Sequence, residues 1–257
     1  MHFLGIADLL IILSLGATLG FFGGLFGIGG GIIAIPLLAL AFGMEQAVAQ
    51  GTSLAMMVPI LVVGFWRYSR RHPIPWRTAL QIGLLASITT FLVAHVATRL
   101  EPGLLRVVFG GFLLLLSLSR LIHHRAAAVT EGTSRFNPKF VPLVGILGGT
   151  AIGLLGIGGG LVATPFLTAC FGQRQTVAQS LSLALVTPCS IIALITYSSA
   201  GCVDWSMGLP LAVGGLFTVS SGVALAHRMP EQRMRIAFAW MILCTAIWLL
   251  LKPFVLN

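Results

Sequence analysis

The stretch Gly24–Leu38 reads GLFGIGGGIIAIPLL, and it returns at Gly153–Leu167 as GLLGIGGGLVATPFL, 129 residues further along the chain. The match runs without a gap from Gly24–Pro59 onto Gly153–Pro188, with 20 identities in 36 positions. Self-similarity at one constant offset predicts a structural unit that is present twice. The chain is accordingly divided into a first membrane repeat at 1–122, a polar linker at 123–137 and a second membrane repeat at 138–257.

The composition indicates that the repeats lie in a membrane. Of the 257 residues, 57% are hydrophobic and 8% are charged, whereas a soluble domain carries about 25% charged residues. A spanning helix needs about 20 apolar residues, so the length allows at most about ten short-looped spans. The net charge of +9 comes from residues in gaps between apolar runs, as the positive-inside rule expects. We therefore expect no nucleic-acid partner.

Each repeat is expected to contain the same helical segments, the first of them interrupted by glycines. The expected helices are Leu4–Phe26, Ile32–Phe42, Gln46–Trp66, Trp76–Thr98 and Leu104–Ile122 in the first repeat, and Phe140–Leu155, Leu161–Phe171, Gln175–Ser199, Trp205–Ala226 and Arg233–Leu251 in the second. The expected fold is an all-α polytopic membrane protein with two inverted repeats. Each repeat would combine a glycine-broken re-entrant or hairpin segment with three transmembrane helices.

The inversion is inferred from charges in equivalent loops. The gap after Trp66 contains four arginines, whereas the equivalent gap after Ser199 contains only Asp204. In the next pair of equivalent gaps, the gap in the second repeat carries the larger net positive charge. Equivalent loops would then face opposite sides of the membrane, which is a common transporter construction. Inversion requires an odd number of crossings per repeat, so the glycine-broken segment must contribute none or two.

The glycine triplets are the first candidate for a binding site. Each glycine disfavours helix by about 1 kcal/mol relative to alanine, and a helix break inside the bilayer is tolerated only within protein or beside water. A helix starting after the break presents free N–H groups and the positive end of its dipole, which suits an anion. The candidate substrate-binding glycines are Gly29, Gly30, Gly31, Gly158, Gly159 and Gly160.

Other glycines and a polar helix face complete the candidates. Glycines spaced four apart, upstream of each triplet, are interpreted as helix-packing residues; these are Gly16, Gly20, Gly24, Gly145, Gly149 and Gly153. Polar residues spaced i, i+4 and i+7 share one helical face; they are Gln46, Gln50 and Ser53, and Gln175, Gln179 and Ser182. They either bond neighbouring helices or line a substrate path. Gln50, Ser53, Gln179 and Ser182 are the preferred substrate ligands, because Gln50 and Gln179 lie deeper in their helices.

The sequence resembles the TauE/SafE sulfite exporter family, also called the YfcA-type permeases. The resemblance rests on the doubled G-I-G-G-G-x-x-x-x-P pattern at Gly27–Pro36 and Gly156–Pro165, and on the V-A-Q that follows at Val48–Gln50 and Val177–Gln179. It implies a multi-pass carrier of sulfite, sulfonates such as sulfoacetate, or related anions in a prokaryotic cytoplasmic membrane. The family is functionally mixed, so the resemblance does not settle the substrate.

These patterns favour a secondary anion carrier, specifically an exporter driven by the membrane potential, a proton gradient or both. A membrane-embedded enzyme is disfavoured because the sequence has no H-E-x-x-H, no C-x-x-C-H and no paired acids. A membrane subunit that does not itself transport is the remaining alternative. The expected partners are a small anionic substrate and membrane lipid, and homo-oligomerisation is left open. The four cysteines lack metal or redox spacing, so no cofactor and no metal are expected.

Overall fold

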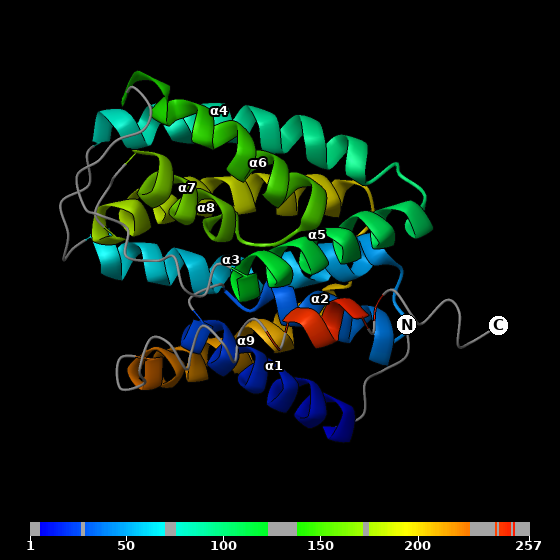
Figure 1. Ribbon diagram of the computed structural model, residues 1–257. Helices are drawn as coiled ribbons and strands as arrows, with labels where there is room; N and C mark the ends of the chain where they lie inside the picture. Colours follow the sequence, from blue (N-terminus) through cyan, green and yellow to red (C-terminus); the bar gives the residue numbers. More distant parts are fainter. Residues whose placement is uncertain are drawn as a thin grey trace. The chain divides into compact units, whose positions relative to one another are not determined.

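The computed structural model describes residues 6–26, 29–69, 76–122, 138–171, 175–226, 240, 242–247 and 249, and these contain helices and no strands. The α-helices, labelled in Figure 1, are α1 (Ile6–Phe26), α2 (Gly31–Ala41), α3 (Gln46–Ser69), α4 (Trp76–Ala97), α5 (Pro102–Ile122), α6 (Val144–Leu155), α7 (Gly160–Phe171), α8 (Gln175–Ser199) and α9 (Trp205–Ala226). A 3₁₀ helix, η2 (Pro138–Leu143), directly precedes α6. The expected all-helical architecture is confirmed.

The expected helix boundaries agree with the structure to within a few residues. One difference is at the start of the second repeat, where Phe140–Leu155 was expected as a single helix. The segment begins as the 3₁₀ helix η2 and becomes α-helical at Val144. Pro142 lies in this turn, and a proline has no N–H to donate to a regular helical ladder. The linker 123–137 and most of the last expected helix, Arg233–Leu251, lie outside the described residues.

The chain forms two compact units that each combine parts of both repeats. Unit 1 comprises Met1–Ile60, Leu100–Arg125 and Cys202–Asn257, and unit 2 comprises Leu61–Arg99 and Ala126–Gly201. Unit 1 therefore contains α1, α2, most of α3, α5 and α9. Unit 2 contains the end of α3, α4, η2 and α6 to α8. The helix α4 of the first repeat thus belongs with the second repeat's α6 to α8, and α9 of the second repeat belongs with the first repeat's α1 to α3.

In unit 1, α1 packs against α9 through a line of glycines. A side chain added at any of these glycines would overlap the backbone of the facing helix. The facing pairs are Gly16 with Leu211, Gly20 with Gly215, and Gly24 with Val219. Glycines four residues apart permit this approach because they place no Cβ between the two helix backbones. The interpretation of these glycines as packing residues is confirmed.

In unit 2, α6 packs against α4 in the same way. The facing pairs are Gly145 with Ile82, Gly149 with Ala86, and Gly153 with Thr90. Every pair is the counterpart of a pair in unit 1 at the offset of 129 residues, with the two repeats exchanged. The Thr90 hydroxyl also donates to the Gly149 carbonyl at 3.2 Å. The duplication seen in the sequence therefore extends to residue-by-residue packing.

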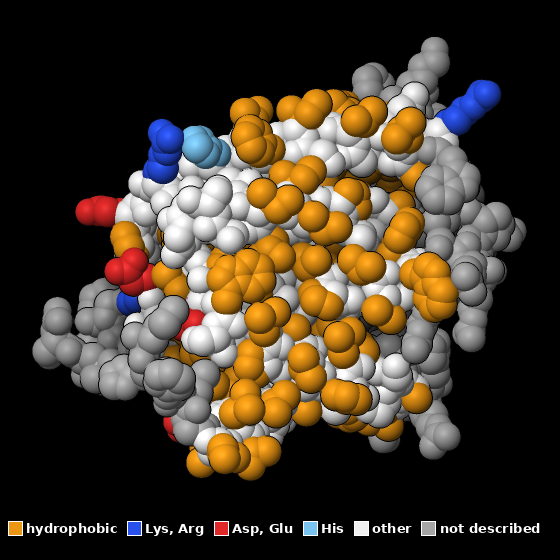
Figure 2. Space-filling model, turned by 180° about the vertical axis from the view of Figure 1, so that it is seen from behind, with side chains coloured by type: hydrophobic (Ala, Val, Ile, Leu, Met, Phe, Trp, Pro, Cys, Tyr) orange, Lys and Arg blue, Asp and Glu red, His pale blue; other side chains and the backbone are white. Residues whose placement is uncertain are grey.

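The surface of the described helices is apolar. Figure 2 shows hydrophobic side chains over most of the visible face, and Phe217 and Leu115 are 82% and 71% exposed. Four described helical segments are long and apolar enough to cross a membrane: Ile6–Leu25, Gln46–Val63, Arg77–Ala97 and Leu181–Ser199. Such an apolar surface is unfavourable in water and favourable in hydrocarbon, where a helix can satisfy the backbone hydrogen bonds along its length internally. The chain is a multi-pass membrane protein.

Candidate functional site

The first glycine break lies between α1 and α2 in unit 1. Gly29 and Gly30 have φ of 70° and 84°, a left-handed conformation that glycine adopts without steric cost. Gly30 is the N-cap of α2, and no side chain caps the helix there. The Gly30 carbonyl accepts from the N–H groups of Ile33 at 3.1 Å and Ala34 at 3.0 Å. The earlier N–H groups of α2 have no intrahelical acceptor, as at every helix start.

The second break lies between α6 and α7 in unit 2, at the equivalent place in its repeat, and follows a different backbone path. Here the left-handed glycine is Gly156, with φ of 65°, and its N–H donates to the Ile152 carbonyl at 2.9 Å. The Gly159 carbonyl then accepts from the N–H groups of Val162 at 3.1 Å and Ala163 at 2.9 Å. The expected helix break is therefore present in both repeats. A new helix follows each break, α2 after the first and α7 after the second.

Both new helices begin against a buried serine. A Cβ on Gly31 would lie 3.3 Å from the Ser53 hydroxyl oxygen, and a Cβ on Gly160 would lie 3.0 Å from that of Ser182. Both serines are buried. They occupy equivalent positions on α3 and α8. The structure thus brings together Gly31 with Ser53 in unit 1 and Gly160 with Ser182 in unit 2, which are two pairs among the predicted site residues.

The two serine hydroxyls differ in their hydrogen bonding. The Ser53 hydroxyl donates to the Met57 sulfur at 3.8 Å. The Ser182 hydroxyl has no hydrogen-bond partner among the described residues. A buried polar group without a partner costs about 1–3 kcal/mol. Ser182 is therefore maintained at a cost to folding in the state that the structure describes, and a ligand with an acceptor atom would remove that cost.

The glutamines of the polar face are only partly described. Gln46 and Gln50 are both fully buried on α3, whereas the side chains of Gln175 and Gln179 lie outside the described set. Both amide atoms of Gln46 lack a hydrogen-bond partner among the described residues. The sequence argument preferred Gln50 because it lies deeper in its helix. In the structure, however, Gln46 and Gln50 are equally buried. Gln46 belongs to the polar face identified in the sequence, and its role in substrate binding stays untested.

The break segments are held against the helices that precede them. A Cβ on Gly23 would lie 2.6 Å from the Gly30 nitrogen, and a Cβ on Gly159 would lie 2.8 Å from the Gly148 carbonyl oxygen. In the first break, a Cβ on Gly30 would also lie 3.0 Å from the Leu19 carbonyl oxygen of α1. Larger residues at Gly30 or Gly159 would therefore displace backbone. Close packing therefore explains the glycine at Gly159, whose φ is not left-handed, and adds to the conformational requirement at Gly30.

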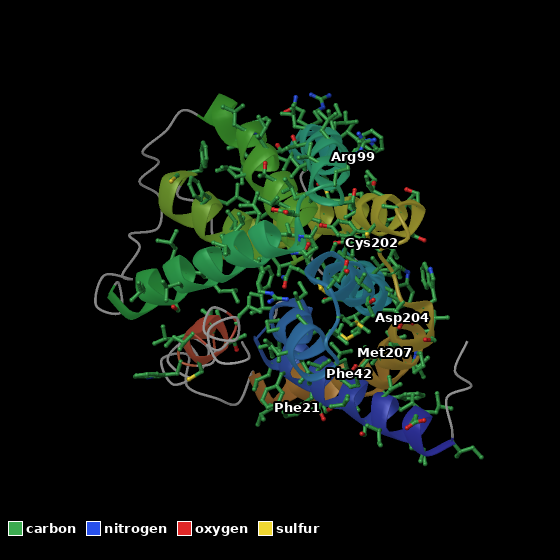
Figure 3. The ribbon with its side chains drawn as sticks, turned by 90° about the vertical axis from the view of Figure 1, so that its right-hand side faces the viewer. Phe21, Phe42, Arg99, Cys202, Asp204 and Met207 are labelled. Carbon is green, nitrogen blue, oxygen red and sulfur yellow. The ribbon has the colours of Figure 1, made fainter. Side chains whose placement is uncertain are left out.

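The start of α9 anchors the polar part of α3 within unit 1. The Asp204 N–H donates to the Thr52 hydroxyl at 3.0 Å, and the Cys202 carbonyl lies directly against Gly51. The Asp204 carboxylate in turn accepts from the Ser206 N–H at 3.0 Å and the Met207 N–H at 3.3 Å, which caps α9. Figure 3 shows Cys202, Asp204 and Met207 following one another into α9. This anchor positions the turn of α3 that carries Gln50 and Ser53.

The ionisable groups of this loop include one thiol with a shifted pKa. Burial raises the pKa of Cys202, and the nearby Glu45 carboxylate raises it further. A raised pKa keeps the thiol protonated and unreactive near neutral pH. Among the described residues no group of three His, Cys, Asp or Glu side chains could hold a metal ion. The site's chemistry in the described structure is therefore that of helix N–H groups, hydroxyls and amides.

A membrane-embedded bundle with duplicated helix breaks and buried polar groups behind them has the construction of a membrane transporter. The chain belongs to the family described as sulfite exporter TauE/SafE, whose model matches residues 12–249. A relative from Methanocaldococcus jannaschii, described as a probable membrane transporter protein, is 27% identical over 97% of each chain. A similarly described protein of Xylella fastidiosa is 26% identical over 95% of this chain and 96% of its own.

A third relative, described as probable membrane transporter protein YunE of Bacillus subtilis, is 25% identical over 85% of this chain and 89% of its own length. The family and these names point to a membrane transporter and not to an enzyme. The resemblance drawn from the doubled glycine motif is thereby confirmed, as is the location in the cell membrane. No solved structure matches the chain.

Proposed function

We propose that this protein is a secondary exporter of small anions such as sulfite or organosulfonates, driven by the membrane potential, a proton gradient or both. The observation that supports this most strongly is the pair of glycine breaks. Each is followed by a helix whose first N–H groups have no intrahelical acceptor, and each has a buried serine beside the first helical residue, Gly31 or Gly160. Helix starts of this kind attract anions through N–H groups and the helix dipole.

Charge placement supports an anion over a cation. The described charged side chains, among them Asp8, Arg77, Arg99 and Asp204, lie near helix ends, and Gln46, Gln50, Ser53 and Ser182 are neutral. No described carboxylate accompanies the buried serines to neutralise a cation. Positive potential within the spans would come from the helix starts instead, and their N–H groups and the serine hydroxyls donate to oxyanion oxygens. The proposed ligands are Gly29, Gly30, Gly31, Gln50, Ser53, Gly158, Gly159, Gly160, Gln179 and Ser182.

The membrane potential is a sufficient energy source for such export. Moving one negative charge out of an inside-negative cell releases about 2.3 kcal/mol per 100 mV. That corresponds to an accumulation ratio of roughly fiftyfold at equilibrium, because each 1.4 kcal/mol is a factor of ten. The competing proposal, a membrane subunit without transport activity of its own, predicts no flux by the isolated chain.

The test is flux through the purified chain in proteoliposomes that contain no other protein. Labelled sulfite is loaded inside, and a potassium diffusion potential makes the interior negative. Export driven by potential predicts efflux that accelerates with the imposed potential and is absent from protein-free liposomes. Gly30→Val adds a β-branched side chain at a left-handed position, so its flux should fall at least tenfold. Leu118→Ile on α5, which is exposed, is the matched control. Absence of flux for sulfite, sulfoacetate and other small anions would favour the subunit alternative.

A further inference from the structure

The two glycine breaks differ in the residue that follows the serine by one helical turn. In the first repeat Ser53 is followed by Met57, and in the second Ser182 is followed by Val186. A second difference lies one turn further, where Leu61 of the first repeat corresponds to Ser190 of the second. The first repeat thus has Ser, Met, Leu on this face of the helix, and the second has Ser, Val, Ser.

In unit 1, Met57 occupies the space in front of α2. Its sulfur lies directly against Gly31, and its methyl carbon lies 3.4 Å from the position of a Cβ there. The same sulfur accepts the Ser53 hydroxyl proton at 3.8 Å. Met57 is completely buried. The thioether therefore takes up both the hydroxyl and the approach to Gly31 that an anion would need.

In unit 2, none of the described side chains fills the equivalent space at Gly160 as Met57 does at Gly31. The nearest carbon of Val186 lies 3.8 Å from the position of a Cβ on Gly160, whereas the Ser182 oxygen lies at 3.0 Å. The hydroxyls of Ser182 and Ser190 are both buried without a partner among the described residues. Two other hydroxyls of α8 donate to carbonyls within the same helix. The Thr187 and Thr196 hydroxyls donate to the Leu183 and Ile192 carbonyls, each at 2.9 Å.

We propose that the two breaks are functionally unequal, with the anion bound at Gly160 and Ser182 while Met57 closes the equivalent place at Gly31 and Ser53. This inference rests on the proposed function and assigns its substrate to one of the two repeats. The ligand is a small oxyanion, such as sulfite or the sulfonate group of an organosulfonate. One of its oxygens accepts from the first N–H groups of α7, and another accepts from the Ser182 hydroxyl. Ser190 offers a second hydroxyl two turns along α8.

The asymmetry can be tested by exchanging the two residues that create it. Met57→Val gives the first repeat the residue of the second, and Val186→Met does the reverse. Ser53→Ala and Ser182→Ala remove the two hydroxyls one at a time. Thr196→Val removes a hydroxyl elsewhere on α8, and Ile195→Met adds a methionine to the exposed face of α8, where Ile195 is 62% exposed. The measurement is equilibrium binding of labelled sulfite to each purified variant, with a thermal melt of each to confirm folding.

We expect the wild-type protein to bind one sulfite per chain. Ser182→Ala should weaken binding about tenfold to a hundredfold, since a hydrogen bond to a charged ligand is lost, and Val186→Met should abolish it. Ser53→Ala should weaken binding less than Ser182→Ala does, because the Ser53 hydroxyl already donates to the Met57 sulfur. The controls Thr196→Val and Ile195→Met should remain within about twofold, which corresponds to a negligible change in binding free energy. Met57→Val should add a second, weaker site. Ser182→Thr retains a hydroxyl and should recover most of the affinity lost in Ser182→Ala.

Specific results would overturn the inference while leaving the proposed function intact. If wild-type protein binds and transports sulfite but Ser53→Ala and Ser182→Ala weaken binding equally, the two breaks are equivalent. If Met57→Val and Val186→Met both leave affinity and stoichiometry unchanged in folded protein, neither residue controls access. If instead the wild-type protein neither binds nor transports sulfite, sulfoacetate or another small oxyanion, the proposed function fails and the inference fails with it.

Discussion

Gly20 of α1 and Gly215 of α9 face each other backbone to backbone, with no room between them for a side chain. Gly149 of α6 has the same relation to Ala86 of α4 at the equivalent place in unit 2. These contacts join helices that are far apart in sequence and belong to different repeats. Each compact unit is therefore assembled from helices of both repeats. The close packing of these helices depends on small residues that have no reactive or polar side chain.

Gly20→Leu should destabilise the protein because the new side chain must displace the backbone of α9. Overpacking in a well-packed core costs about 1–3 kcal/mol and occasionally more, and rigid backbone cannot yield as a flexible side chain does. We expect a clearly lower melting temperature in detergent, measured by intrinsic fluorescence. Gly83→Leu on α4 is the control, because nothing lies within 4 Å of a Cβ at that position. Equal melting of the two variants would contradict close packing at Gly20.

Gln50→Leu and Gln179→Leu should reduce anion flux more than they reduce expression or stability. An amide that binds substrate loses its hydrogen bonds on this change while the helix keeps its apolar packing. Flux per folded protein in proteoliposomes is the measurement, with the melting temperature recorded in parallel. Unchanged flux per folded protein would assign these glutamines to helix packing alone.

Gln46→Leu should behave differently in the melt. Both amide atoms of Gln46 lack a described partner, and replacing a buried unsatisfied polar group by an apolar one of similar shape is close to neutral or stabilising. We therefore expect an unchanged or higher melting temperature in detergent. A large loss of stability would show that this amide is satisfied in the folded protein. A loss of flux without a loss of stability would add Gln46 to the substrate ligands.

Cys202 should react slowly with thiol reagents at neutral pH. Burial and the Glu45 carboxylate both raise the pKa of its thiol, and the thiolate is the reactive form. The alkylation rate should therefore rise with pH over a range above that of an ordinary exposed cysteine. Glu45→Gln removes the negative charge, lowers the thiol pKa and should speed alkylation at a fixed pH. The assay uses protein in which the other three cysteines are replaced. A slower reaction in Glu45→Gln would contradict the sign of this electrostatic effect.

The inverted arrangement of the two repeats stays a prediction, because the arginine-rich loop after α3 lies outside the described residues. Single cysteines at Ser69 and Ser206, in a chain without native cysteines, separate the alternatives. A membrane-impermeant maleimide applied to intact cells should label the position beside Asp204 and not the one beside Arg70. Labelling of both from the same side would mean that the repeats are parallel. The argument for an odd number of crossings per repeat would then fail as well.

Local sequence features predicted the helices and the breaks well. The ends of the apolar runs and the glycine triplets lie within a few residues of the observed boundaries, because helix propensity and chain reversal depend on neighbouring residues. The family resemblance came from the same local motif. The i, i+4 and i+7 spacing placed Ser53 and Ser182 on the polar face of their helices, and the structure buries both beside the helix starts at Gly31 and Gly160. Their role as substrate ligands stays a prediction. Gln46 shares that spacing and is fully buried as well, which the sequence alone did not indicate.

The sequence by itself determined that the chain is a duplicated, helical membrane protein with a glycine break in each repeat, because composition and local propensity carry that information. Only the tertiary structure decided that α1 packs on α9 and α6 on α4, since the repeat is equally compatible with packing inside each half. It also decided that the Ser53 hydroxyl meets a methionine sulfur while the Ser182 hydroxyl has no described partner. Such differences depend on which atoms lie around a side chain in three dimensions, and nearly identical motifs do not reveal them.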